Sequence, residues 1–467
     1  MDKKELKRDF FFVLSSKVAI IAFGFIQIII IPKLLGPANM GLYSFWLSVL
    51  LIISTIIDFG GPEILTRYIP ELKIKCQFSI KELIIQNIKI KIIFIPFLLF
   101  SGLYLFRHEK FYFIIIFFAS IFVSMSNLMQ AGFYGFKDFN RYSMIQASRI
   151  LIRLIFVILL FKLLGSVGII YALLGGAVLT AVLFFPKIIK LIPRQHEKLP
   201  KSPMEYLSYG LYLYPGNILV ILNSWSVVIL VEYYISDMEI VGYMGLAIQI
   251  CLFAITGVLA SVYESIFPSL IELHTNNHSQ LKKFIGFNWK YTNLILMPTV
   301  VGFYFLAEPT IAFFIGIDYL PAVEIIKYLL PAVVFFTWRG VYQQVLLIYE
   351  RKKEYLFIQL AGFIAFIISA VLLINKIGVL GAPIAISFGT FISFLLCYIF
   401  IKKLLNIKSF LHCTTKPFLA SIIVISVINF IISIDSIFML ILSIIIYSSI
   451  YLFIMIIIKE ISLDEIK

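Results

Sequence analysis

Long apolar stretches recur along the whole chain, separated by charged clusters or by Gly, Pro and Asn. A helix needs about 20 mainly apolar residues to cross a hydrocarbon core about 30 Å thick. About fourteen stretches meet this requirement, at residues 10–31, 42–57, 84–106, 111–129, 145–164, 167–189, 207–231, 241–267, 287–306, 323–349, 355–374, 379–401, 417–432 and 437–458. The predicted fold class is therefore an all-α polytopic membrane protein.

The composition agrees with lipid as the main solvent. Of the 467 residues, 61% are hydrophobic and only 14% are charged, with a mean hydropathy of +1.02. Soluble proteins are nearer half apolar and about a quarter charged. This excludes a soluble enzyme with one anchor, a secreted disulfide scaffold and a nucleic-acid-binding domain. The cysteines are far apart and form no C-x-x-C pair, so no disulfide framework or zinc site is predicted.

The formal net charge of +14 is interpreted as an orientation signal. Cytoplasmic loops of multispanning proteins collect Lys and Arg. With a cytoplasmic N-terminus, nearly all basic residues fall on the cytoplasmic side, and the outer segments hold only Lys33, Arg107, Lys110, Lys162, Lys327 and Lys376. The predicted topology therefore has both termini in the cytoplasm, and nucleic acid is not a predicted partner.

The longest hydrophilic break divides the chain into two predicted lobes. We expect a six-helix lobe at 1–192, a cytoplasmic linker at 193–206, a second six-helix lobe at 207–402, and two additional helices with a tail at 403–467. A weak repeat agrees, because Gly41-Leu42-Tyr43 and Gly242-Tyr243 each open the second span of a lobe. Paired halves are typical of secondary transporters.

Short motifs in a fixed order give the chain a family resemblance. They are Lys33-Leu34-Leu35-Gly36-Pro37, Gly41-Leu42-Tyr43, Asp58-Phe59-Gly60-Gly61-Pro62, Arg67-Tyr68, Gly135-Phe136-Lys137-Asp138-Phe139, the stretch from Gln344 to Lys353, and Gly378-Val379-Leu380-Gly381-Ala382-Pro383-Ile384-Ala385. In this order and spacing they resemble bacterial polysaccharide or O-antigen repeat-unit flippases (Wzx-type) of the multidrug, oligosaccharidyl-lipid and polysaccharide (MOP) exporter superfamily. The resemblance runs from the first span through the twelfth.

This resemblance implies a flippase of the bacterial inner membrane. Its substrate is expected to be an undecaprenyl-pyrophosphate-linked oligosaccharide, moved from the cytoplasmic to the outer leaflet by alternating access through a cationic central cavity. The other expected partners are membrane lipid and, as a hypothesis, a polysaccharide polymerase or chain-length regulator. No cofactor is expected, and coupling to a proton or sodium gradient is a hypothesis. The family often has an Asp in the seventh helix, where this chain has Asn223 and Ser224.

Cations inside the predicted spans are the candidate contacts for an anionic head group, because a charge at mid-bilayer must face protein or a cavity. Arg339 lies deepest and is followed by Gln343; the alternative is a structural clasp between helices. Arg153 shares a helical stripe with Gln146 and Arg149, and Lys17 shares a face with Gln27. Arg149 is expected to snorkel to the cytoplasmic surface, and snorkelling stays an alternative for Arg153 and Lys17. Lys89 and Lys91 are interpreted as residues that closely flank the third span and not as substrate contacts.

The Gly-rich break after the second span is a candidate gating or ion-coupling site. Asp58 is expected to pair with Arg67 or with a cation in the cavity, and Arg67 is a candidate substrate contact. Asn217 and Ser224 share a face of the seventh helix, which Pro215 is expected to kink. Gln249 is the corresponding candidate in the eighth helix.

The sequence contains no motif of a known catalytic site. It lacks H-E-x-x-H, a phosphate loop and a G-x-S-x-G elbow, so we expect a transporter without catalytic or metal-ligating residues. His274 and His278 lie among polar loop residues. Two alternatives stay open: a multidrug exporter of the same superfamily, which would favour acidic cavity residues, and a membrane polysaccharide polymerase, which would need acidic residues on a large outer loop.

Overall fold

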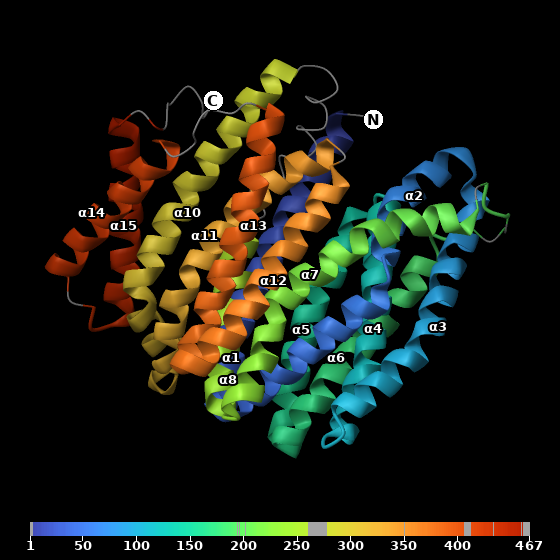
Figure 1. Cartoon of the computed structure of the whole chain (residues 1–467), viewed down its shortest axis with the longest axis horizontal. Coiled ribbons are helices and arrows are strands. Elements are labelled where there is room, and N and C mark those ends of the chain that lie inside the picture. The colour runs from blue at the N-terminus through green and yellow to red at the C-terminus, as the bar shows by residue number, and fades with distance from the viewer. Residues whose placement is uncertain are drawn as a thin grey trace. The chain divides into compact units, whose positions relative to one another are not determined.

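A computed structural model describes residues 3–193, 195, 197–200, 202–259, 278–349, 351–405, 412–432, 434–458 and 460. Within these ranges, side chains are described except at 3–19, 253, 278–284, 347, 404–405 and 412. The described residues form helices and short connections, with no strand among them (Figure 1). The chain divides into two compact units, Met1–Gly245 and Leu246–Lys467, and each is considered by itself.

The first unit is built around one long kinked helix, α1 (Lys3–Asp58). Helices α4, α5 and α7 pack along α1, and α6 packs on α4 and α5. The other elements of this unit are α2 (Gly61–Lys75), η1 (Gln77–Ser79), α3 (Ile80–Leu105), α4 (Lys110–Gly135), α5 (Phe139–Leu164), α6 (Ser166–Ile189), α7 (Pro203–Ile235) and the start of α8 (Met238–Ile248). Helix α5, which carries Arg149 and Arg153, is therefore a direct neighbour of α1.

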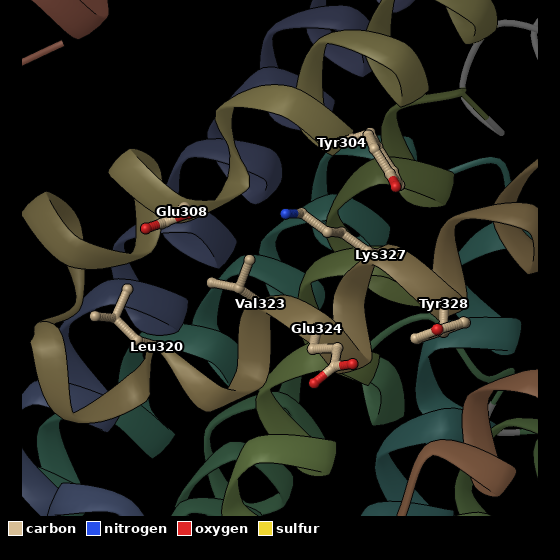
Figure 2. Close-up of a pocket in the computed structure, with 7 residues that line it drawn as sticks. All are labelled: Tyr304, Glu308, Leu320, Val323, Glu324, Lys327 and Tyr328. Carbon is tan, nitrogen blue, oxygen red and sulfur yellow. The ribbon is translucent and has the colours of Figure 1, made fainter.

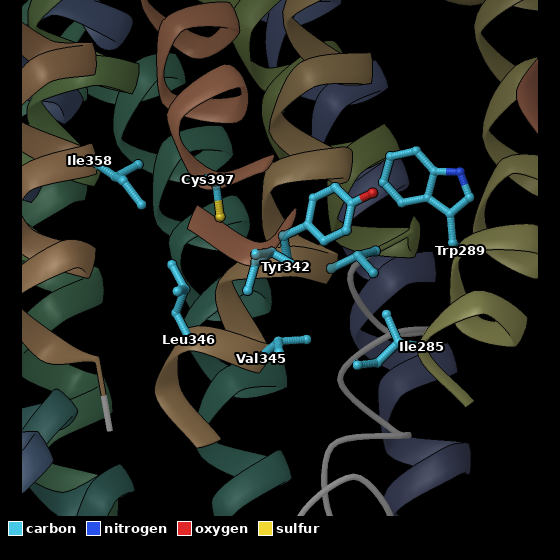
Figure 3. Packing of buried hydrophobic residues seen from close by; sticks show 9 residues of the cluster. Ile285, Trp289, Tyr342, Val345, Leu346, Ile358 and Cys397 are labelled. Carbon is cyan, nitrogen blue, oxygen red and sulfur yellow. The ribbon is translucent and has the colours of Figure 1, made fainter. Parts of the chain in front are cut away.

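Helices α11, α12 and α13 pack together in the second unit, and α14 and α15 pack beside α10 (Figure 1). The elements are a π-helical stretch η2 (Gln249–Ile255), α10 (His278–Phe314), η3 (Ile317–Tyr319), α11 (Pro321–Ile348), α12 (Lys352–Ile377), η4 (Gly378–Leu380), α13 (Gly381–Leu405), α14 (His412–Ile431) and α15 (Ile437–Ile457). Trp289 stacks on Tyr342 at 4.8 Å between ring centroids, within an apolar cluster that includes Val345, Leu346 and Cys397 (Figure 3).

The first two predicted spans lie within α1 as two helical segments joined at a sharp break. Gly36 has φ +73° inside α1, between Pro32 and Pro37. Each proline removes one intrahelical hydrogen bond, and glycine adopts the left-handed conformation without a steric penalty. The expected outer turn is therefore a kink within a helix.

Eleven described segments are long and apolar enough to cross a membrane. Two of them, Ile20–Asp58 with 39 residues and Lys352–Lys403 with 52, are long enough for two passes each at about 1.5 Å per residue. Helix α5 is not among the eleven, because it carries several basic residues. The chain is a multi-pass helical membrane protein, whereas the count of fourteen and the orientation of the termini stay predictions.

The end of α7 and the start of α8 belong to the first unit. Helix α7 packs on α1 and α2, and the preceding hydrophilic break is also attached there, because Ser79 Oγ donates to the Lys198 carbonyl at 2.8 Å. The compact units thus divide at Gly245 and Leu246 and not within 193–206. The predicted six-helix lobes at 1–192 and 207–402, the linker at 193–206 and the additional helices at 403–467 stay a prediction.

The two repeated Gly-containing motifs lie against each other in the first unit. A Cβ on Gly41 would lie 1.8 Å from the Met238 carbonyl oxygen, and one on Gly242 would lie 2.2 Å from the Pro37 carbonyl oxygen. Three residues further along each helix, a Cβ on Gly245 would lie 2.1 Å from Ser44 Oγ. The contact is reciprocal, since each glycine packs on the turn that precedes the other.

Candidate functional site

The break between α1 and α2 places Asp58 inside the first unit. Phe59 has φ +48° and Gly60 has φ +73°, so the chain reverses over two left-handed residues. Helix α7 passes so closely that a Cβ on Gly60 would lie 2.6 Å from the Gly210 carbonyl carbon. Only glycine satisfies both the backbone conformation and this approach. Asp58, the last residue of α1, is consequently buried with 8% exposure.

Asp58 is the acceptor at the centre of a buried network from three helices. Lys91 Nζ on α3 lies 3.4 Å from Asp58 Oδ1 and donates to Ser124 Oγ at 2.8 Å. On α4, Ser124 Oγ donates to Asp58 Oδ1 at 2.6 Å and Asn127 Nδ2 donates to Asp58 Oδ2 at 2.8 Å. Both carboxylate oxygens are therefore satisfied away from water, as a buried charge requires.

The cation that pairs with Asp58 is Lys91 and not Arg67. The sequence alone indicated that Lys91 flanks its span, yet its side chain is 8% exposed. Arg67 lies instead over the ring of Tyr209, with its guanidinium carbon 4.7 Å from the centroid. Of the two pairing hypotheses for Asp58, the structure supports a cation inside the helix bundle.

Two arginines one turn apart on α5 form the most unusual feature of the unit. Arg153 Nη2 donates to Gln27 Oε1 on α1 at 2.9 Å, and Gln27 Nε2 donates to Tyr43 Oη at 3.5 Å. Among the described residues, the buried Nε of Arg153 and the buried Nε and Nη2 of Arg149 have no hydrogen-bond partner. Buried donors of charged groups are costly when unsatisfied, so this stripe has spare donors for an anion.

The fold thus brings together Arg153 and Gln27, which the sequence indicated as two separate candidates. Arg149, which the sequence treated as a snorkelling residue, is buried at two of its nitrogen atoms. The backbone of α1 includes Lys17, but the Lys17 side chain lies outside the described residues, so its predicted contact stays a prediction.

Glu63 on α2 is a further carboxylate beside this network. Asn217 Nδ2 on α7 donates to Glu63 Oε1, and the nearby Tyr214 hydroxyl donates to the Ile56 carbonyl at 2.5 Å. Burial, with the charge of Asp58, raises the pKa of Glu63. The gating candidate Asn217 therefore has a carboxylate as its partner. Ser224 instead donates to its own helix, to the Val220 carbonyl at 3.0 Å.

The deep cation of the second unit, Arg339, joins two helices. It is 3% exposed and its Nη1 on α11 donates to Gln359 Oε1 on α12 at 3.1 Å, while Gln359 Nε2 donates to Gln343 Oε1 at 3.1 Å. Its guanidinium carbon lies 4.5 Å from the Phe336 ring centroid. The predicted pair Arg339 and Gln343 is connected through Gln359, a residue that the sequence did not indicate.

Gln249 begins the π-helical stretch that follows α8. Its side chain is buried, and its Nε2 has no hydrogen-bond partner within the described ranges. π-Helical turns often mark functional positions. The position agrees with a gating role, which stays a prediction.

The described residues include no group of three His, Cys, Asp or Glu that can hold a metal ion. His274 and the His278 side chain lie outside them. A cavity of about 550 Å³ lies between α10 and α11, where Glu308 and Tyr304 of α10 face Lys327, Glu324 and Tyr328 of α11 (Figure 2). It contains none of the predicted site residues, and Lys327 lies over the Tyr304 ring, 5.5 Å from its centroid.

Comparison with known proteins identifies the family of this chain. Residues 6–274, more than half of the chain, match the family described as polysaccharide biosynthesis protein. The chain belongs to this family. No curated protein matches the chain.

Solved structures show which fold this family member has. It is similar to a structure described as lipid II flippase MurJ in an inward closed conformation, with 17% identity, coverage of 97% of this chain and 99% of the other, and a TM-score of 0.77. An inward-facing multidrug resistance MATE family transporter of the MOP superfamily matches with 14% identity, coverage of 85% and 98%, and a TM-score of 0.63.

A MOP superfamily transporter from Pyrococcus furiosus, whose structure is described by a reverse polarity of the binding pocket, matches with 15% identity, coverage of 85% and 95%, and a TM-score of 0.53. At these identities the likeness shows the fold. The polysaccharide biosynthesis family member is accordingly a multi-pass helical protein with a MOP superfamily fold, as its sequence motifs predicted.

Proposed function

We propose that the protein is a flippase that moves undecaprenyl-pyrophosphate-linked oligosaccharide repeat units from the cytoplasmic to the outer leaflet of the bacterial inner membrane. The units would serve surface polysaccharide synthesis, with a polymerase or chain-length regulator as a downstream partner. Transport would proceed by alternating access and without a cofactor. The similarity to a lipid II flippase supports this proposal through the fold.

The observation that carries the proposal is the arginine stripe on α5. Arg149 and Arg153 are one turn apart and repel each other electrostatically, and both retain buried donors without partners among the described residues. A pyrophosphate diester offers several acceptor oxygens and two negative charges, which match two guanidinium groups. Such a stripe needs an anion, and the diphosphate is the anionic part of this substrate.

The same observation weighs against a multidrug exporter. A lipophilic cation would be repelled by Arg149, Arg153 and, in the other unit, Arg339. The carboxylates Asp58 and Glu63 already have partners in Lys91 and Asn217. A cationic drug would therefore have to displace Lys91 or bind beside the positive charges of Arg149 and Arg153, both of which are unfavourable.

The decisive experiment deletes the gene in its host and locates the lipid-linked repeat units. For a flippase, single units accumulate in the cytoplasmic leaflet, where an impermeant glycan-modifying reagent does not reach them. For a polymerase, single units accumulate in the outer leaflet and react. Normal polysaccharide export in the deletion strain would rule the proposed function out, and complementation with the wild-type gene is the control.

A further inference from the structure

Asp58 occupies a set of donors that an anionic ligand also requires. Lys91 Nζ, Ser124 Oγ and Asn127 Nδ2 converge on its two carboxylate oxygens from α3 and α4. An ammonium group, a hydroxyl and an amide that all donate to the two oxygens of one carboxylate form an anion site. In this conformation the anion is a side chain of the protein itself.

The donor set lies beside the arginine stripe. Arg149 on α5 interacts electrostatically with both Asp58 and Arg153. Asn127 is only half-buried, so one donor of the network is partly exposed. A ligand bound by the two arginines thus has a neighbouring set of donors, which Asp58 now fills.

We propose that Lys91, Ser124 and Asn127 form a second subsite for the substrate's diphosphate, and that Asp58 is an internal counter-ion which this anion displaces while Asp58 takes up a proton. The inference rests on the proposed function for the identity of the anion. One O–H bond forms on Asp58 per anion bound, with the proton supplied by water on the side from which the anion enters.

A proton on Asp58 removes its repulsion from the incoming anion. Without it, the Asp58 carboxylate and the two charges of a diphosphate diester would meet at Lys91, the one cation of the donor set, with Arg149 as the next cation that interacts with Asp58. Excess negative charge is costly in a low-dielectric site, and one proton reduces it.

Asp58 is the group that takes the proton because it competes with the anion for the same donors. Glu63 accepts from Asn217 on α7, a residue outside this donor set. The remaining titratable neighbour is Tyr214 on α7, whose hydroxyl donates to a backbone carbonyl. Lys91 fills the cation position at Asp58 before the anion binds, and the exchange that we propose places a proton on Asp58 when the anion takes its donors.

The test measures binding of UDP-N-acetylglucosamine to the purified full-length protein in lipid nanodiscs. This probe is a pyrophosphate diester with two fixed negative charges, so its own ionisation does not change between about pH 6 and about pH 8. Calorimetry in two buffers of different ionisation enthalpy counts the protons taken up. The wild type is expected to take up about one proton per probe and to bind up to about tenfold more tightly for each unit of decrease in pH.

Asp58→Asn, which mimics the protonated residue at every pH, is expected to bind the probe at about pH 8 at least as tightly as the wild type does at about pH 6, with no proton uptake. Glu63→Gln should retain the proton uptake. Lys91→Gln should weaken binding at every pH. The matched control is Lys89→Gln, because Lys89 is exposed two residues away on α3 and its loss should leave binding unchanged.

Several results would overturn the proposal: proton uptake that persists in Asp58→Asn, proton uptake that disappears in Glu63→Gln, or absence of probe binding to both the wild type and Asp58→Asn. If Lys91→Gln does not fold, the Asp58→Asn/Lys91→Gln double variant, which removes both charges, replaces it. Saccharide export with pH-independent probe binding would keep the function and reject the displacement. Probe binding with proton uptake, in a protein that does not support saccharide export, would keep the displacement and reject the proposed function.

Discussion

Gly41 and Gly242 pack on each other's preceding turn, so that a Cβ on either would overlap a carbonyl oxygen, that of Met238 at 1.8 Å or that of Pro37 at 2.2 Å. These residues open corresponding predicted spans of the two halves. Such a close crossing is possible only without side chains, as in small-residue contacts of other membrane helices. The contact is thus a position where one methyl group changes the distance between two helices.

Replacing Gly41 or Gly242 by Ala is expected to destabilise the protein by about 1–3 kcal/mol through overpacking, and Val should abolish transport. Thermal unfolding in detergent and complementation of polysaccharide export measure the two effects. Gly24→Ala is the matched control, since a Cβ at Gly24 meets nothing within 4 Å. Equal stability of the Gly41 and Gly24 variants would show that the helices do not cross this closely.

Replacing Arg149 by Gln is expected to reduce transport at least tenfold while raising the free energy of unfolding by up to about 1 kcal/mol. The stability gain follows because the variant removes a buried charge with unsatisfied donors. Export assays and thermal unfolding give the two readouts. Lys162→Gln, which removes an exposed charge from the same helix, is the control. A loss of stability together with activity would indicate a purely structural arginine.

Replacing Arg339 by Ala is expected to abolish transport and to lower stability by about 2 kcal/mol, because Gln359 loses a charged donor inside the protein. Arg339→Lys should restore part of the transport by restoring the charge, though Lys lacks the planar group that lies over Phe336. Gln359→Leu separates a structural role of Arg339 from substrate contact, since this variant removes the hydrogen bond between α11 and α12 but keeps the positive charge. Full export by the Ala variant would reject Arg339 as a substrate contact.

Glu63 is expected to make the protein less stable as pH rises. Burial raises its pKa above the ordinary value of 4.5, so the folded state holds the proton more tightly than the unfolded state. The resulting stabilisation is complete below the ordinary value and is lost as pH rises through the raised value. Glu63→Gln keeps an acceptor for Asn217 and should remove this loss.

The measurement for Glu63 is the difference in melting temperature between wild type and Glu63→Gln as a function of pH. That difference should increase with pH in favour of the variant. Glu71→Gln, in a residue paired with Lys75 at 3.0 Å further along α2, is the control and should leave the pH profile unchanged. A difference that stays constant with pH would contradict the raised pKa.

Several candidate site residues follow from the sequence because they interrupt the apolar pattern of a span. Arg339 and Arg153 are cations far from the ends of predicted helices, and the cost of lipid exposure requires that they face protein. Their partners did not follow from this argument. Gln359 and Gln27 are polar residues like many others in membrane helices, and only the packing of α12 on α11, and of α1 on α5, identifies them.

Lys91 was misplaced for a related reason. Lys91 is close to the charged start of its predicted span, which suggested a residue at the edge of the membrane. A lysine at such a position can either snorkel to the surface or stay buried, and the sequence does not distinguish the two. A signal was present, since Ser124 and Asn127 are polar residues three positions apart on one face of α4. The pairing needs the break at Gly60, which directs Asp58 toward α3 and α4.

The sequence by itself determined that the chain lies in lipid, that it is helical and which family it belongs to. This was possible because the thickness of the hydrocarbon core and the cost of burying a charge restrict which residues can follow one another in a span. The tertiary structure alone decided which charges neutralise one another. Asp58 meets Lys91 across 33 residues, Ser124 across 66 and Asn127 across 69. In lipid a buried ion must find its partner on another helix, and local sequence does not encode which helix that is.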